Sequence, residues 1–137
     1  MSVIHIDTGA VEAAMQEQGR SVTWLAKACG VSTNNVNRFL AVGKVQDVTL
    51  WRIEDALGLS SAALMQLPKG QLTTGQSLLL TRLEARLSVF ELAARAYLSA
   101  QTIAGYERDK MPSLGFAWQV AKAMDMSIEQ VFFRENK

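Results

Sequence analysis

The chain has 137 residues, of which 49% are hydrophobic and 20% charged, with one cysteine and a formal net charge of +1. This composition is typical of a globular, mostly helical protein and excludes the disordered and fibrous classes. The lone Cys29 excludes a disulfide framework and a cysteine-rich zinc site, and no apolar run reaches the roughly 18 residues that a membrane span needs. We therefore expect a cytoplasmic protein.

The first seven residues, MSVIHID, contain Val3, Ile4 and Ile6 among polar neighbours. Such a segment can form a short strand or an apolar arm, and a frayed terminus is the simplest interpretation. From residue 11 onward, apolar residues recur at spacings of three and four, and short polar or glycine breaks separate them. This pattern predicts about five short helices before residue 68 and about five more after residue 76.

The segment SVTWLAKACGVSTNNVNRFL, from residue 21 to residue 40, predicts a helix, a tight turn and a second helix. Ala26 is small where two helices cross closely, Gly30 can take a left-handed backbone conformation at the turn, and Ser32 can cap the next helix. Val36 and Phe39 then face the core.

The outward face of that second helix carries Thr33, Asn34, Asn37 and Arg38. Amide side chains can pair with adenine, arginine with guanine or phosphate, and hydroxyls with bases or backbone, so the set suits a DNA major groove. The alternative is a plain solvated helix face. Arg20 and Lys44 are candidates to hold phosphates beside it, or are ordinary surface charges.

The segment LPKGQLTTGQS is rich in Gly, Pro, Thr and Ser, which indicates a linker. We place a first domain at residues 1–68, a linker at 69–76 and a second domain at 77–137. A shift of 67 positions superimposes the two domains without a gap, and nine of 57 residue pairs are identical. The identities fall at helix-pair and capping positions, such as Leu25 with Leu92 and Ser32 with Ser99, so we interpret the domains as two copies of one unit.

A further pattern runs through the second copy, SVFELAARAYLSAQTIAGYERDKMPS. It consists of a leucine-alanine pair, a serine, an aliphatic residue, an aromatic residue with Glu, two basic residues and a proline: Leu92, Ala93, Ser99, Ile103, Tyr106, Glu107, Arg108, Lys110 and Pro112. This pattern resembles the XRE family, the Cro and lambda-repressor type of helix-turn-helix. The resemblance implies an all-α fold of two tandem lambda-repressor-like units and DNA binding by the helices near 32–40 and 99–106. It also implies a protein encoded by a bacterium, a phage or a plasmid.

Each copy also departs from that family's pattern. The first has Leu40 and Ala41 where the family places Glu and a basic residue, and the second has Tyr97 where it places a turn glycine. The recognition helix of the second copy is rich in small residues, which offer few contacts to bases. We therefore expect the first copy to make most of the base contacts. The second offers Gln101 and Thr102 for bases, with Arg108 and Lys110 for phosphates. The predicted DNA-binding set is Ser32, Thr33, Asn34, Asn37, Arg38, Lys44, Ser99, Gln101, Thr102, Arg108 and Lys110.

We expect a double-stranded DNA operator as the partner and a homodimer as the species that binds it. We expect no membrane, no cofactor, no metal and no evident small-molecule effector. Catalysis has no support, because the only histidine, His5, has no triad or metal-ligand spacing around it. The competing hypothesis is a protein-interaction module, including an antitoxin-like autoregulator, in which one or both copies no longer contact DNA. Phe133, whose equivalent is Gln66, is the candidate dimer contact.

Overall fold

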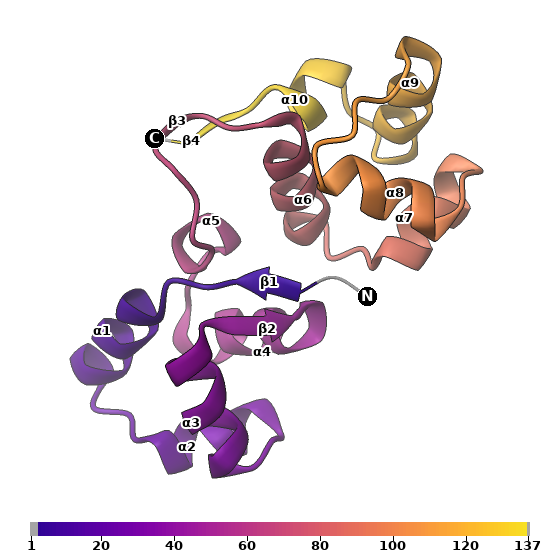
Figure 1. Cartoon of the computed structure of the whole chain (residues 1–137). Coiled ribbons are helices and arrows are strands. Elements are labelled where there is room, and N and C mark those ends of the chain that lie inside the picture. Colours follow the sequence, from indigo (N-terminus) through magenta and orange to yellow (C-terminus); the bar gives the residue numbers. More distant parts are fainter. Residues whose placement is uncertain (1–2, 137) are drawn as a thin grey trace. The chain divides into compact units, whose positions relative to one another are not determined.

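The computed structural model describes residues 3–136 and is mostly helical, with ten helices and four short strands in that range (Figure 1). The chain divides into two compact units, one ending at Gln66 and one beginning at Leu67. We call them the first unit and the second unit. Across residues 3–136, no helix combines the length and the apolarity needed to traverse a bilayer.

The first unit contains five helices and a two-stranded sheet. Its elements in chain order are β1 (Val3–His5), α1 (Thr8–Gln18), α2 (Val22–Cys29), α3 (Thr33–Val42), β2 (Lys44–Gln46), α4 (Asp47–Leu57) and α5 (Ser61–Leu64). The predicted number of helices is confirmed for this unit. Within the N-terminal segment, Val3–His5 form a strand and not a frayed end, because they pair with β2 and because Ile4 and Ile6 are almost fully buried.

The second unit also contains five helices. Its elements are β3 (Gly70–Gln71), α6 (Thr74–Glu84), α7 (Val89–Ala96), α8 (Ala100–Glu107), α9 (Leu114–Ala123), α10 (Ile128–Phe132) and β4 (Glu135–Asn136). The segment 69–76, which the sequence predicts to be a linker, therefore carries β3 and the first turn of α6. That helix begins at Thr74 because Thr73 and Gln76 form a reciprocal capping box.

Serine caps set the same helix starts in both units. Ser21 and Ser88 cap α2 and α7, and Ser32 and Ser99 cap α3 and α8, each by accepting a hydrogen bond from a backbone N–H three residues later. The members of each pair are 67 residues apart. The identical serines in the sequence are thus positions at which a side chain determines where a helix begins.

The strands differ between the units. In the first unit, β1 pairs antiparallel with β2, with Ile4 opposite Val45, and Ile6 forms a bridge with Met65. In the second unit, β3 pairs instead with β4 near the end of the chain. The segment before the first helix therefore meets the segment after the fifth helix in both units, but only the first unit adds a strand directly after its third helix.

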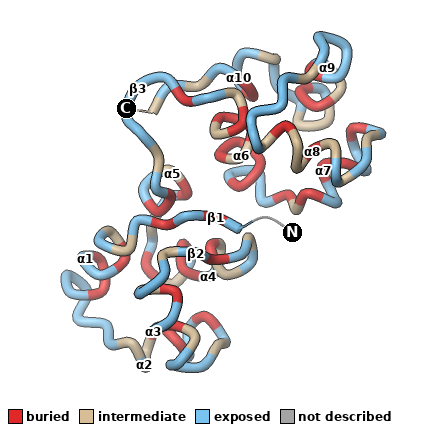
Figure 2. The backbone as a smooth tube through the Cα atoms, viewed as in Figure 1, coloured by how far each residue is buried: buried red, intermediate tan, exposed pale blue. Residues whose placement is uncertain are grey.

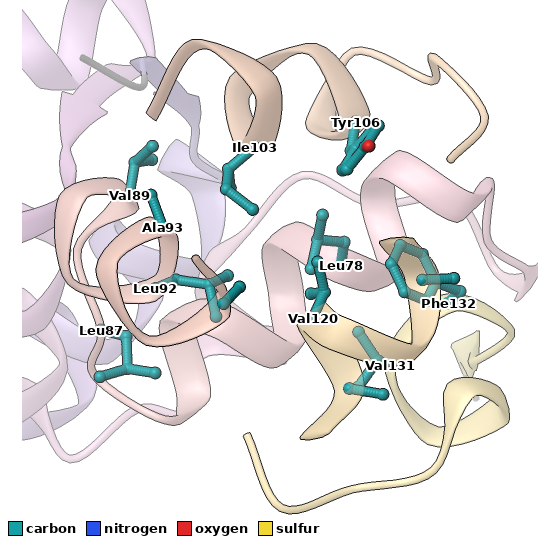
Figure 3. Packing of buried hydrophobic residues seen from close by; sticks show 13 residues of the cluster. Leu78, Leu87, Val89, Leu92, Ala93, Ile103, Tyr106, Val120, Val131 and Phe132 are labelled. Atoms are coloured by element: carbon teal, nitrogen blue, oxygen red, sulfur yellow. The ribbon is translucent and has the colours of Figure 1, made fainter. Parts of the chain in front are cut away.

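Each unit has its own apolar core (Figure 2). In the first unit, Val11, Leu25, Val36, Leu50 and Ile53 have no exposed surface. In the second unit, Ile103 and Tyr106 of α8 point into a cluster formed with Leu78, Val120 and Phe132 (Figure 3). The third helix of each unit is therefore fixed by one buried face, and its other face stays outside.

Candidate nucleic-acid interface

Helices α2 and α3 form a helix-turn-helix in the first unit. The turn depends on Gly30, which takes a left-handed conformation with φ of 67° and closes α2 by bonding to the carbonyls of Ala26 and Lys27. Leu25 and Val36 are buried between the two helices. This packing leaves Thr33, Asn34, Asn37 and Arg38 exposed, as the sequence predicts.

A side-chain hydrogen bond orients the arginine of this exposed face. Arg38 donates from Nη2 to Oδ1 of Asn35 at 2.6 Å. Asn35 precedes Arg38 by three residues, a spacing that makes neighbours on a helix surface. Sequence reasoning missed Asn35 as a positioning residue, although this spacing was the signal that could have found it.

The strand β2 places Lys44 beside the recognition helix. Alternation along β2 buries Val45 against Ile4 and leaves Lys44 and Gln46 exposed on the opposite face. Together with Asn35 and Arg38, these two residues line an open hollow of about 490 Å³ between α3 and the start of α4. The hollow has two cationic side chains on its rim, so it suits an anion such as a phosphate.

Helices α7 and α8 form the corresponding pair in the second unit. Tyr97 takes the turn position with φ of 58°, so a non-glycine residue adopts the left-handed conformation here. Gln101 is exposed on α8. The hydroxyl of Thr102 lies 2.7 Å from the capping hydroxyl of Ser99, so the two side chains hold each other.

An anchored loop presents Arg108 and Lys110 after α8. Between them, Asp109 has φ of 71° and accepts a hydrogen bond from the N–H of Gly75 at 3.0 Å. A Cβ on Gly75 would lie 2.6 Å from that carboxylate and from the carbonyl of Glu107, so only glycine permits this approach. Both basic side chains are exposed and line a hollow of about 570 Å³.

The two hollows occupy equivalent places but differ in chemistry. Arg38, Lys44 and Thr49 of the first correspond to Gly105, Met111 and Phe116 of the second. Phe39 corresponds to Tyr106, and burial raises the pKa of the Tyr106 phenol, which therefore stays neutral. The two hollows therefore present different side chains at equivalent positions.

A long polar side chain from the fourth helix fixes the turn in each unit. Arg52 donates from Nη1 to the carbonyl of Cys29 at 2.9 Å, and Gln119 donates from Nε2 to the carbonyl of Ala96 at 3.0 Å. The two donors and the two carbonyls are each 67 residues apart. Both bonds satisfy the last carbonyl of the helix before the turn. No sequence signal marked these residues, because an exposed Arg and a Gln on a helix are unremarkable.

The departure of Leu40 from the family pattern has a structural reason. In the second unit, Glu107 forms an ion pair with Arg82, which has no exposed surface. The equivalents in the first unit are Leu40 and Met15. Both partners of the ion pair in the second unit are therefore replaced by apolar residues in the first unit.

The predicted residues Arg20 and Phe133 line neither of these hollows. The guanidinium of Arg20 lies 4.2 Å from the centroid of the Trp24 ring, so its charge stacks on that indole. Phe133 follows α10 and is 52% exposed. It borders a separate apolar hollow with Leu114.

A family model described as helix-turn-helix matches residues 80–131. The match runs from within α6 to α10 of the second unit and covers less than half of the chain. Members of this family are in general DNA-binding regulators and not enzymes. The match agrees with the XRE-like sequence pattern of the second unit, which includes Leu92, Ser99 and Glu107. No curated protein and no solved structure matches the chain.

Proposed function

We propose that the protein is a sequence-specific double-stranded DNA-binding transcriptional regulator, acting as a repressor and built from two tandem lambda-repressor-like units. The observation that carries the proposal is the exposed face of α3, where Asn34, Asn37 and Arg38 project from a rigid helix beside Lys44. The family match adds support for the second unit. Repression by occupying a promoter requires no further contact with polymerase.

The mechanism begins with insertion of α3 into the major groove of an operator. Asn34 and Asn37 read adenine edges, and Arg38 reads guanine through the guanidinium that Asn35 orients. Thr33 and the capped N-terminus of α3 at Ser32 approach the backbone, and Lys44 neutralises a phosphate. The separation of roles follows from the fold, because α3 is held by its buried face and Lys44 by a strand.

The second unit has a smaller share of base reading. Gln101 is its exposed amide and reads a base. The hydroxyls of Ser99 and Thr102 are hydrogen-bonded to each other, so they contribute to DNA binding by fixing the start of α8. Arg108 and Lys110 hold phosphates on either side of the anchored Asp109. We propose a homodimer in the cytoplasm as the species that binds DNA, because two chains related by a twofold axis can each read one half of an inverted repeat.

A second candidate function is protein interaction by one or both units, including an antitoxin-like role. The observation that favours it is the apolar character of the second unit's surface, where Tyr97 is 90% exposed and Leu114 77% exposed. Contiguous apolar patches on a protein surface mark sites of interaction with other proteins. This candidate predicts no DNA selectivity for the second unit.

Selection of DNA from a random pool, followed by binding titrations at several salt concentrations, tests the proposal. Asn37→Ala should degrade the recovered motif at particular bases, and Gln101→Ala should show whether the second unit also reads. Arg38→Ala should weaken cognate binding by about 1 to 3 kcal/mol and random DNA much less, if the contact is to a base. Gln16→Ala, an exposed change on α1, is the control that should alter neither.

Equal loss on cognate and random DNA would make Arg38 a phosphate contact instead. The absence of any motif, together with no binding at low salt, would refute DNA binding and favour the protein-interaction candidate.

A further inference from the structure

The hollow beside α8 in the second unit combines cationic side chains with exposed apolar ones. Arg108 and Lys110 supply the charge, and among residues 3–136 no acidic residue lines this hollow. Met111 and Phe116, which also line it, are 66% and 45% exposed. Its volume of about 570 Å³ falls within the range of about 300 to 1,000 Å³ that is usual for sites of small molecules.

The two cations are available because the acidic residues beside them are engaged elsewhere. Glu107 forms the ion pair with the buried Arg82, and Asp109 accepts a hydrogen bond from a backbone N–H of α6 at 3.0 Å. In the part of the chain that the structure describes, the side chains of Arg108 and Lys110 form no ion pair and no hydrogen bond. Their charge is therefore open to an anion.

A glycine of α8 brings one of these cations over the helix. A Cβ on Gly105 would lie 3.7 Å from Cδ of Lys110, so the aliphatic part of the lysine side chain passes close to the helix at this position. The first unit has the opposite arrangement, with Arg38 on the helix and Gly43 in the loop. The second unit therefore supplies its cation from the loop, and the helix surface beneath that cation has no side chain of its own.

The apolar side chains distinguish this hollow from a plain phosphate site. Met111 and Phe116 stand at positions where the first unit has Lys44 and Thr49. A phosphate gains nothing from an exposed phenyl ring or a thioether, whereas an aromatic ring stacks on the first and packs against the sulfur of the second. The ligand that satisfies both kinds of side chain is an aromatic ring that carries an anionic group.

We propose that this hollow binds a small aromatic anion, that is, a ring that carries a phosphate or a carboxylate. The ring stacks on Phe116 and contacts Met111, and the anionic group is held by Lys110 and Arg108. The exposed amide of Gln101 lines the same hollow and donates a hydrogen bond to a polar atom of the ligand. The bound ligand covers the outer face of α8.

Binding of this ligand opposes binding of DNA by the second unit, an effect that rests on the proposed function. The proposed duplex contacts of this unit use Gln101, Arg108 and Lys110, which are the polar groups that the ligand takes. The same side chains cannot hold a nucleic-acid phosphate and the ligand at once, so the two compete. The ligand is therefore an effector that weakens the contact of the second unit with DNA.

A titration of the full chain without DNA tests the site directly. The probes are the aromatic anions phenyl phosphate, indole-3-carboxylate and adenosine 5′-monophosphate, and the NMR chemical shifts of the backbone amides report binding. At least one probe should bind with a Kd between about 10 µM and 1 mM, as expected for ligands of this size. The shifts should centre on Gln101, Gly105 and Phe116. Inorganic phosphate, acetate, indole and adenosine should each bind at least about tenfold more weakly than the tightest probe.

Two results of this titration would overturn the proposal. One is a Kd weaker than about 1 mM for all the aromatic anions. The other is inorganic phosphate that binds as tightly as phenyl phosphate, because the hollow would then hold an anion without any part for the apolar side chains.

Matched variants locate the ring of the ligand. Phe116→Thr introduces the residue of the first unit and should weaken binding at least about fivefold, the usual effect of removing a stacking side chain. Gly105→Leu should fill the hollow without changing the charge, and Arg38 shows that the fold accepts a long side chain at this position. Phe90→Thr is the control, because Phe90 is 62% exposed in the same unit but lines neither hollow. A folded Phe116→Thr variant that binds as tightly as wild type would overturn the proposal.

A second pair of variants locates the anionic group. Lys110→Gln should weaken binding about tenfold, because the ligand loses a charged hydrogen bond. Arg95→Gln removes another exposed cation, on α7, that lines neither hollow, and it should bind the ligand as the wild-type chain does. Circular dichroism checks that each variant stays folded. Equal losses for the two variants would mean that only the overall charge matters, which would overturn the assignment of Lys110.

Titration with a random-sequence duplex at fixed ionic strength tests the competition. The tightest probe, at about ten times its Kd, should weaken duplex binding by the wild-type chain about threefold or more, and binding by the Phe116→Thr variant much less. Unchanged duplex binding by the wild-type chain would overturn the competition. A chain that binds the aromatic anion but no DNA would refute the proposed function alone. A chain that selects a DNA motif but binds none of the probes would refute this inference alone.

Discussion

Arg82 holds the carboxylate of Glu107 with two hydrogen bonds, from Nε at 2.5 Å and from Nη2 at 3.2 Å, without any exposed surface of its own. It also donates from Nη1 to the carbonyl of Leu87 at 2.9 Å. One side chain therefore joins α6, the end of α8 and the loop before α7. The equivalent residues of the first unit are the apolar Met15 and Leu40, which gives a template for exchanging the pair.

Arg82→Met alone should lower the free energy of unfolding of the second unit by about 3 to 5 kcal/mol, because it leaves a carboxylate buried without the guanidinium. The double change Arg82→Met with Glu107→Leu should recover most of that loss. Urea denaturation followed by Trp118 fluorescence measures both. Arg134→Met, which breaks the more exposed pair with Glu84, is the comparison and should cost about 1 kcal/mol or less. A double variant no more stable than the single one would contradict this account.

The turn in the second unit stores backbone strain. Tyr97 has φ of 58° and is 90% exposed, so its side chain gains little from burial while its backbone stays left-handed. Because that conformation costs an L-residue about 1 to 2 kcal/mol, Tyr97→Gly should stabilise the second unit by about 1 kcal/mol.

The reciprocal change is Gly30→Ala in the first unit, where φ is 67°. It should destabilise that unit by about 1 kcal/mol, as followed by Trp24 and Trp51 fluorescence. If Tyr97→Gly lowered the melting temperature instead, the Tyr97 ring would be contributing more than its exposure indicates.

The bond from Arg52 to the Cys29 carbonyl should be replaceable by a glutamine. Arg52→Ala should lower the free energy of unfolding of the first unit by about 1 to 2 kcal/mol, because the last carbonyl of α2 loses its donor. Arg52→Gln should keep most of the stability, as Gln119 makes the same bond in the second unit. Lys69→Ala, which removes an exposed positive charge elsewhere, is the control. Equal losses for the Ala and Gln variants would show that charge and not the hydrogen bond matters.

Cys29 should be unreactive in the folded chain and should make stability fall at alkaline pH. Burial raises the pKa of the Cys29 thiol, and the nearby Arg52 opposes this only in part. Above the ordinary thiol value of about 8.5, the unfolded chain loses the proton while the folded chain keeps it, so unfolding becomes easier as pH rises.

Denaturation between about pH 7 and pH 10, compared with a Cys29→Ala variant, isolates this contribution because the variant lacks the thiol in both states. Thiol reagents should modify wild-type Cys29 only as fast as the chain unfolds. Rapid modification at neutral pH would mean that the thiol is accessible in the native state.

The helices could be predicted because local chemistry decides them. Serine caps such as Ser32 and Ser99, and apolar residues such as Val36 and Ile103 one turn later, determine a helix start and its buried face within a few residues. The exposed positions of Asn34, Asn37 and Arg38 follow from the same periodicity. Because equivalent residues of the two units are 67 positions apart, the same prediction applies to both units.

The pairing of the strands and the contacts between helices could not be predicted in this way. Pairing of Ile4 with Val45 joins residues about forty positions apart, and no local pattern near Ile4 specifies that partner. The bond from Arg52 to Cys29 likewise depends on how α4 crosses the turn. The approach of Asp109 to Gly75 was hidden for the same reason, although it decides how Arg108 and Lys110 are presented.

In both units the segment that enters the first helix pairs with the segment that leaves the fifth, through Ile6 with Met65 and through β3 with β4. A module whose two ends meet can be copied in tandem, or inserted into the loop of another protein, without opening its core. Recombination that adds or removes one such module changes the length of the chain and leaves the remaining modules intact. The architecture is therefore suited to growth by whole repeats, and each added repeat is free to acquire a surface of its own.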